Sequence, residues 1–568
     1  MSDTLTGSEL PRRLADRYVD EYIALDPITG TYLGHAPSAR LLPDFSPAGR
    51  AAVADLARRT LDLLTVSEAL PGADGDEERR CARLLRERLT AELAVHDADE
   101  DLRAISNIHS PIHAVREAFS LTPTDTDEDW DAVADRLRAV PAAVAGYRES
   151  LELGLSRGLY AGPKATVTFV GQLGTWIGES AEAGETPEAF FAAFVAPAPE
   201  ALRAGLEEAA AGATAALRRL RDWLGEVYAP TVAGRPDVVG RERYARWSRY
   251  FNGTDLDLDE AYAYGWAEYH RLLAEMTAEA AKILPGAGPW EALAHLDEHG
   301  THIEGVDEVR DWLQGLMDEA IESLDGTHFD LAEPVRRVES RIAPSGGAAA
   351  PYYTSPSEDF SRPGRTWLPT MGQTRFPVYD LVSTWYHEGV PGHHLQLAQW
   401  TYVADRLSRY QAGIGMVSAN AEGWALYAER LMDELGHLKD AEQRLGYLDC
   451  QMMRACRVIV DIGMHLGLEI PADSPYRPGE RWTPETAQEF FGLHSGRPAD
   501  FVESELIRYL SMPGQAIGYK LGERAWLLGR ENARAAHGED FDLKAWHMAA
   551  LSLGSLGLDD LVDELSRL

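Results

Sequence analysis

The stretch FPVYDLVSTWYHEGVPGHHLQLAQWTYVADRL, residues 376–407, holds a His-Glu pair, a Pro-Gly pair and two adjacent histidines in close succession. A His-Glu pair followed by further histidines is typical of zinc hydrolases, in which two imidazoles hold the metal and the glutamate takes a proton from water. A helix that carries such a pair spaces its histidines one turn apart. Here the position one turn after His387 is Pro391, which ends or kinks a helix.

The Pro-Gly break decides which histidines can meet at one ion. On a straight helix His394 would share the face of His387 but lie about 10 Å along the axis. Zn–N bonds are about 2 Å long, so that separation is too great. We therefore predict that the first helix ends near Val390 and that a bulge or tight turn folds the chain back. Either His393 or His394 then meets His387. We prefer His393, which directly follows the break, and leave His394 to support the site or face the substrate.

A third ligand is predicted on the next helix, VSANAEGWALYAERLMDELG, residues 417–436. Glu422 lies near its start among small and apolar residues, and it would complete a site of two histidines and one carboxylate with a coordination position left open. Glu429, two turns further on, is a weaker candidate or a partner that orients a ligand histidine. Glu388 is predicted as the general base. The expected metal is one Zn²⁺ ion, and other divalent metals remain possible.

The composition bounds the class of protein. Hydrophobic residues make up 45% and charged residues 26% of the 568, which is enough apolar material for a folded core. The 54 Lys+Arg against 91 Asp+Glu give a net charge of −37, which argues against nucleic-acid or anionic-membrane partners. The 3 cysteines form neither a disulfide framework nor a thiolate zinc site. The start of the chain lacks the pattern of a signal peptide, so we predict a cytoplasmic protein.

Helical periodicity dominates the chain, as in residues 78–102, 201–228 and 261–284. Alternating strand-like runs are short, and residues 165–173 are the best strand candidate. We predict a mainly α, zincin-like (gluzincin-type) metallohydrolase with a central cleft and at most a small β-sheet. The Gly/Ala-rich segment near residue 345 is predicted to separate an N-terminal helical half, 1–345, from a C-terminal catalytic half, 346–568.

Hydrolysis of an amide also needs donors for the oxyanion that develops on the carbonyl. The segment RYLSMPGQAIGYKLGERAW, residues 508–526, offers such donors, with Tyr519 and Arg508 the first candidates. Its other polar residues are Tyr509, Gln515 and Lys520. Loops beside a site often bind substrate, and the segment before the metal helix contributes Tyr352, Tyr353, Arg362 and Arg365.

Charged residues recur on an otherwise apolar helix that contains Arg454, Arg457, Asp461 and His465. Buried charges need partners. One interpretation is that an arginine holds Glu422, Glu429 or a carboxylate of the substrate. The other is an Arg457–Asp461 pair one turn apart on the same helix.

The motifs HEGVPGHHLQ (387–396) and NAEGWALYAERL (420–431) resemble a bacterial family of unknown function numbered 885, DUF885. That family carries a His-Glu-x-x-Pro-Gly-His-His-x-Gln signature and is regarded as metallopeptidase-like. Further matching pieces are residues 352–364, 454–467 and 508–522. The resemblance implies a mainly helical fold and a zinc-dependent hydrolase, and it specifies no substrate.

The expected function is hydrolysis of peptide or related amide bonds, with short peptides as substrates. Two alternatives stay open. The same two histidines and one carboxylate could hold iron in an oxygenase, although that chemistry needs no base such as Glu388. The chain could also be an inactive helical binding protein that keeps the scaffold.

Overall fold

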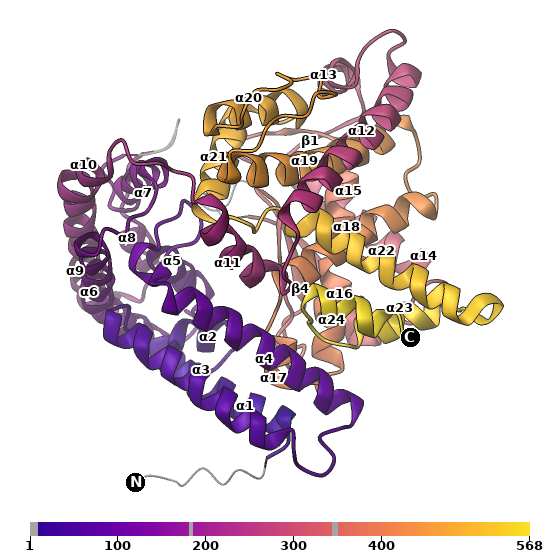
Figure 1. The fold of residues 1–568 in the computed structure, drawn as a ribbon. Helices are drawn as coiled ribbons and strands as arrows, with labels where there is room; N and C mark the ends of the chain where they lie inside the picture. Colours follow the sequence, from indigo (N-terminus) through magenta and orange to yellow (C-terminus); the bar gives the residue numbers. More distant parts are fainter. Residues whose placement is uncertain (1–8, 181–185, 344–349) are drawn as a thin grey trace. The chain divides into compact units, whose positions relative to one another are not determined.

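A computed structural model describes residues 9–180, 186–343 and 350–568, and it is mainly helical with two small sheets (Figure 1). The predicted mainly α fold is confirmed. The chain divides into two compact units, one made of residues 1–74, 89–239 and 510–512 and the other of 75–88, 240–509 and 513–568. The boundary predicted near residue 345 lies outside the described residues. No described helix combines the length and apolar character needed to cross a lipid bilayer.

The first unit is built around two long helices, α6 (Asp127–Ser156) and α9 (Glu200–Trp223), which pack against each other. Their buried faces join one apolar core that includes Phe119, Leu137 and Leu217. The remaining helices of this unit are α1 (Pro11–Leu25), α2 (Pro27–Tyr32), α3 (Pro47–Ser67), α5 (Pro111–Leu121), α7 (Pro163–Trp176), α8 (Phe190–Val195) and α10 (Ala229–Val232), and α4 (Asp76–Asp97) contributes to both units.

The strand predicted over residues 165–173 is wrong, because these residues lie within α7. Pro163 occupies the first turn of α7, where proline favours a helix. Burial at Ala165, Phe169 and Leu173 recurs every four residues, which is the period of a helix face rather than of a strand. The local alternation of threonine and valine resembles a strand pattern, but the buried positions follow the period of a helix.

The second unit is organised around α19 (Ala441–Leu466). Every residue of α19 from Leu445 to His465 is buried, because helices pack around it on several sides (Figure 1). The other helices of this unit are α11 (Gly240–Asn252), α12 (Leu258–Ile283), α13 (Pro289–His299), α14 (Val306–Leu324), α15 (Val378–Glu388), α16 (His393–Tyr402), α17 (Arg409–Ala412), α18 (Ser418–Glu434), α20 (Pro484–His494), α21 (Ala499–Ser511), α22 (Gly518–His537), α23 (Leu543–Leu551) and α24 (Leu558–Leu565).

Two small sheets precede α15 and α16 in this unit. In one, β4 (Gly364–Leu368) lies between β2 (Val338–Ile342), which is parallel to it, and β3 (Tyr352–Thr354), which is antiparallel. In the other, β1 (His302–Glu304) pairs antiparallel with β5 (Arg375–Pro377), and α15 follows β5 directly.

Helices α18 and α22 cross at two glycines. A Cβ on Gly423 would lie 2.3 Å from the backbone carbon of Gly522, and a Cβ on Gly522 would lie 2.0 Å from the carbonyl oxygen of Ala419. Such distances are far inside van der Waals contact, so only glycine fits at either position. The two helices therefore touch backbone to backbone one residue after Glu422.

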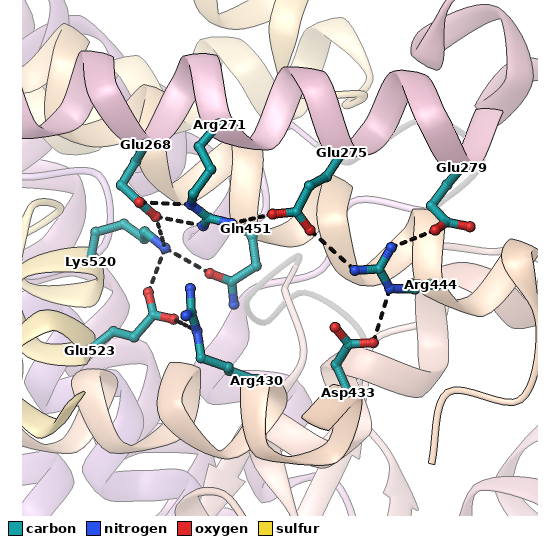
Figure 2. Close-up of polar contacts among 10 residues, drawn as sticks. All are labelled: Glu268, Arg271, Glu275, Glu279, Arg430, Asp433, Arg444, Gln451, Lys520 and Glu523. Carbon is teal, nitrogen blue, oxygen red and sulfur yellow. Dashed lines mark hydrogen bonds and ion pairs between the residues drawn. The ribbon is translucent and has the colours of Figure 1, made fainter. Parts of the chain in front are cut away.

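A buried polar network ties α12, α18, α19 and α22 together (Figure 2). Lys520 of α22 is fully buried, and its ammonium donates to Oε1 of Gln451 at 2.9 Å and lies 3.0 Å from Oε2 of Glu268. It also pairs with Glu523. Arg430 of α18 contacts Glu523 at 2.9 Å, which extends the network to the helix that carries Glu422.

The same network continues along α12 through two further guanidinium groups. Arg271 pairs with Glu268 at 2.8 Å and with Glu275 at 2.6 Å. Arg444 of α19 pairs with Glu275, with Glu279 and with Asp433 of α18. Because each charge has an opposite partner, attraction within the network offsets part of the desolvation penalty that burial imposes.

Replacing Lys520 with methionine should destabilise the protein. The substitution leaves Glu268 and Glu523 buried without the ammonium, and breaking a buried pair costs about 3 kcal/mol or more. We expect the lower end, because Arg271 and Arg430 still contact the two glutamates. Urea unfolding followed by tryptophan fluorescence measures the loss. Lys282→Met is the control, because that lysine is 60% exposed and its pair should contribute less than about 1 kcal/mol. Equal effects of the two substitutions would contradict the role given to the network.

Candidate metal centre

The helix breaks between α15 and α16, as the Pro-Gly pair predicts. Helix α15 ends at Glu388, close to the predicted Val390, and α16 begins at His393. The peptide bond between Val390 and Pro391 is cis. The break is a tight turn between two helices, so the histidines on its two sides are brought together.

Close backbone packing shapes this turn. A Cβ on Gly392 would lie 2.0 Å from the carbonyl oxygen of His387, so the turn requires glycine there. The indole of Trp424 on α18 donates a hydrogen bond to the carbonyl oxygen of Pro391 at 2.9 Å. The helix that carries Glu422 thus holds the turn that carries the histidines.

Three predicted ligands converge at this point. Nε2 of His387 and Nε2 of His393 each lie 3.4 Å from the same oxygen, Oε2 of Glu422. The two imidazole rings are 4.7 Å apart, centroid to centroid, and nearly perpendicular. The predicted set of His387, His393 and Glu422 therefore shares one small region.

Two of the three separations among these donor atoms match those of a tetrahedral metal site, and a second group that could hold an ion is His387, His393 and Glu388. Two donors about 2.1 Å from one ion at the tetrahedral angle are about 3.4 Å apart, which matches both N–O separations. Oε2 of Glu422 is buried and accepts no hydrogen bond from a described residue. Burial opposes ionisation of Glu422, but His387 and His393 outweigh it and hold the pKa of this carboxyl well below its usual range. An ionised carboxylate oxygen without a hydrogen-bond donor, together with two imidazole nitrogens, makes a donor set suited to Zn²⁺.

Glu388 lies beside this group. One of its oxygens and one ring nitrogen of each of His387 and His393 lie within 4.8 Å of one another. The pKa of Glu388 is raised to about 8, mainly by burial; His393 opposes the rise and Glu422 adds to it. A carboxyl with a pKa near neutrality can both accept and return a proton, which is the property that general acid–base chemistry requires.

A second carboxylate orients His387 from behind. Oε1 of Glu429 lies 2.7 Å from Nδ1 of His387, so that nitrogen donates to Glu429 and Nε2 is left to face Glu422. Ser383 donates to Oε2 of Glu429 at 2.6 Å, and Arg454 lies 3.1 Å from Oε1. Glu429 thus plays the supporting part that was one of its two predicted roles.

His394 is placed differently. Its Nε2 donates to the carbonyl oxygen of Val335 at 2.7 Å, and its Nδ1 accepts from the hydroxyl of Tyr353 at 2.9 Å. Burial lowers the pKa of His394 to about 4, and the bond to Val335 partly offsets this, so the ring is neutral. With both nitrogens committed, His394 ties β3 and the segment before β2 to α16.

Of the predicted donors from residues 508–526, Tyr519 lies beside His387, whereas Arg508 and Lys520 are paired with other side chains. Tyr519 is partly exposed, and its ring stacks at 6.4 Å, centroid to centroid, from the ring of His387. Arg508 donates to Gln515 at 2.9 Å and pairs with Glu505 at 2.7 Å. Lys520 instead belongs to the buried network of Figure 2 and contacts none of the three metal-ligand candidates.

The charged residues of α19 also find partners. Arg457 pairs with Glu505 at 2.8 Å, and its Nε donates to the hydroxyl of Tyr509 at 3.0 Å. Asp461 accepts from the hydroxyl of Tyr244 at 2.8 Å and from the amide of Gly514 at 2.9 Å. The Arg457–Asp461 pair is therefore not formed. The other interpretation, in which an arginine holds Glu429, is confirmed, because Arg454 pairs with Glu429.

Sequence reasoning missed Ser383 and Glu505. Glu505 precedes Arg508 by three residues and Tyr509 by four, a helical spacing that could have indicated it. Of the predicted loop residues, Tyr353 reaches His394, Tyr352 stacks on Trp367 at 5.9 Å, and Arg365 pairs with Glu339 at 3.0 Å. Arg362 lies in the irregular segment before β4.

Comparison with known proteins decides the family. The model of the bacterial protein family of unknown function DUF885 matches residues 27–565. The chain belongs to DUF885. No curated protein matches it.

Two solved structures share the DUF885 chain's fold. A "putative lipoprotein" from Colwellia psychrerythraea has a TM-score of 0.83 at 20% sequence identity, with 98% of each chain covered. A "putative lipoprotein of unknown function" from Shewanella oneidensis has a TM-score of 0.72 at 18% identity, with 98% of this chain and 100% of that one covered. At such identities the likeness concerns the fold alone.

Proposed function

We propose that this DUF885 protein is a zinc-dependent hydrolase that cleaves peptide or related amide bonds. The observation that carries the proposal is the position of one buried oxygen, Oε2 of Glu422, 3.4 Å from Nε2 of His387 and 3.4 Å from Nε2 of His393. Glu388 beside these atoms favours hydrolysis over the oxygenase alternative, which needs no base in that position.

Each residue of the candidate site has a separate role in the proposed reaction. His387, His393 and Glu422 would hold the metal, and a zinc ion bound there would supply Lewis acidity toward water and the substrate carbonyl. Glu388 accepts the proton of the attacking water and returns it to the leaving amine. Glu429 keeps Nε2 of His387 directed at Glu422 by accepting from Nδ1. Tyr519, whose ring lies 6.4 Å from that of His387, is the neutral donor whose hydroxyl would stabilise the oxyanion.

Elemental analysis and peptide digestion test this function together. We expect one zinc per chain in the purified protein, cleavage of short peptides in a mixed library, loss of cleavage on chelation and recovery when Zn²⁺ is added back. Iron in place of zinc, with oxygen-dependent turnover, would favour the oxygenase. Protein that holds no metal and cleaves no peptide would favour the inactive binding protein.

The cytoplasmic location stays a prediction. Both solved relatives carry the name lipoprotein, so attachment to a membrane is the alternative for this chain. Separation of membrane and soluble fractions from cells that express the full chain distinguishes the two locations.

A further inference from the structure

A buried arginine lies over the ring of Tyr519. Tyr519 belongs to the first turn of α22, and the guanidinium carbon of Arg457 on α19 is 4.7 Å from the centroid of its ring. Arg457 is only 6% exposed. A guanidinium over the face of a tyrosine is attracted to the ring, and the attraction is strongest where water is excluded. The contact is therefore of the kind that fixes a ring in one orientation.

Two partners fix the plane of the Arg457 guanidinium itself. Its Nε donates to the hydroxyl of Tyr509 at 3.0 Å, and its Nη2 lies 2.8 Å from Oε2 of Glu505. The hydroxyl of Tyr509 donates in turn to the same oxygen of Glu505 at 2.7 Å. Because one edge of the planar guanidinium is bound in this closed arrangement, its face is left for the ring of Tyr519.

The hydroxyl of Tyr519 is available to a substrate. It makes no hydrogen bond with a described residue, and the side chain is partly exposed. The ring lies 6.4 Å from that of His387, centroid to centroid, and is nearly parallel to it, at 17°. Burial raises the pKa of Tyr519 and Glu422 adds to the rise, while Arg508 and Arg457 partly oppose it, so the phenol keeps its proton at neutral pH.

The backbone of α22 is fixed independently of Arg457. A Cβ on Gly522 would lie 2.0 Å from the carbonyl oxygen of Ala419, so close packing against α18 holds the helix in place. The freedom left to Tyr519 is rotation of its side chain. A contact to the ring therefore controls where the hydroxyl lies, whereas the position of the helix does not depend on that contact.

We infer that Arg457 is a positioning residue for Tyr519. Held by Glu505 and Tyr509, its guanidinium keeps the phenol beside His387, where the hydroxyl donates to the oxyanion of the substrate. A cation over the ring also draws electron density from it, which makes the hydroxyl a stronger hydrogen-bond donor. This inference rests on the proposed hydrolase function, and it extends the residues on which turnover depends to α19 and α21.

A double-mutant cycle tests whether Arg457 acts through Tyr519. Tyr519→Phe should lower kcat about 10²- to 10³-fold with little change in KM, the usual cost of losing one oxyanion donor. Arg457→Met alone should lower kcat about 10- to 30-fold, as expected when a water-excluded cation–π contact is lost. In the Tyr519→Phe background, the same substitution should change kcat by less than about 3-fold. Equal losses in both backgrounds overturn the inference and leave the hydrolase intact.

Arg530→Met is the matched control. Arg530 is also a buried arginine that lies over a tyrosine ring, with its guanidinium carbon 5.1 Å from the centroid of Tyr427, and it pairs with Glu434 at 3.0 Å. It contacts none of the three candidate metal ligands in any described interaction. Its substitution should therefore leave kcat and KM at their wild-type values.

Tyr509→Phe serves in the cycle if Arg457→Met fails to fold. It removes only the hydroxyl that accepts from Nε of Arg457 and leaves the pair with Glu505 in place. The loss of this one hydrogen bond should lower kcat about 3- to 10-fold, and the loss should disappear in the Tyr519→Phe background. Undiminished kcat in Tyr509→Phe, with Arg457→Met unfolded or equally undiminished, overturns the inference.

Fluorine NMR of the zinc-free protein tests the contact without turnover. Meta-fluorotyrosine replaces tyrosine throughout, and the resonance that Tyr519→Phe lacks is assigned to Tyr519. Arg457→Met should shift and broaden this resonance because the ring loses the cation at its face, whereas Arg530→Met should leave it unchanged. Peptide cleavage by the wild type with an unchanged resonance in Arg457→Met overturns the inference alone. A shifted resonance without any cleavage by the wild type overturns the hydrolase and supports the positioning of Tyr519 by Arg457.

Discussion

Glu388→Gln is expected to keep its zinc and to lose about 10²- to 10⁴-fold in the rate of peptide hydrolysis, which is the usual contribution of a general acid–base group. Glutamine has nearly the same shape as glutamate and cannot accept a proton. Because burial raises the pKa of Glu388 to about 8, the carboxyl is mostly neutral at pH 7 without a metal, and the neutral glutamine should not weaken the fold. Turnover is measured on a peptide cleaved by the wild-type protein, and zinc content by elemental analysis of the same sample.

The control for this substitution is Glu304→Gln. Glu304 is an exposed glutamate of β1 that pairs with Arg375 at 3.1 Å, so both zinc content and turnover should be those of the wild type. Undiminished turnover in Glu388→Gln would remove Glu388 as the base. Loss of zinc from Glu388→Gln would make Glu388 a ligand, a role for which its oxygen lies close enough.

His393→Ala and His394→Ala should differ sharply in their affinity for zinc. His393 offers Nε2 toward Glu422, so its removal should weaken zinc binding by more than the roughly 10- to 100-fold typical of residues that only support a ligand. His394→Ala should keep one zinc per chain, because neither of its nitrogens is available. Competition with a chromophoric chelator measures the two affinities.

His394→Ala should instead lower stability. Its removal leaves the carbonyl of Val335 and the hydroxyl of Tyr353 without their partner, and an unmet buried group costs about 1–3 kcal/mol. Urea unfolding measures this loss. The reverse pattern, with zinc lost from His394→Ala and kept by His393→Ala, would exchange the roles of the two residues.

The arrangement of the metal motif could be predicted from sequence because it depends on local covalent rules. Proline one turn after His387 cannot continue a helix, so the motif must divide into two helices joined by a turn, and Glu422 follows later in the chain on α18. The choice between His393 and His394 could not be made in this way. It depends on Val335 and Tyr353, which are distant in sequence and whose partners no spacing rule specifies.

The partners of buried charges were the hardest part to predict. Lys520 follows Tyr519 directly in sequence, yet it contacts Glu268 of α12 rather than the site. Glu505 joins two arginines from different helices, one of them Arg457 of α19. Such pairs depend on how distant helices pack. A single sequence shows that a buried charge needs a partner but not which residue supplies it.

The crossing of Gly423 and Gly522 limits how the helices that carry Glu422 and Tyr519 can move. With the two backbones in direct contact, neither helix can slide or tilt past the other without a clash. The carboxylate of Glu422, the proposed metal ligand, and the phenol of Tyr519 thus lie on two helices held rigidly together. If the proposed hydrolase function holds, the motion that admits a peptide must arise in other segments, and the distance between Glu422 and Tyr519 should stay constant during turnover.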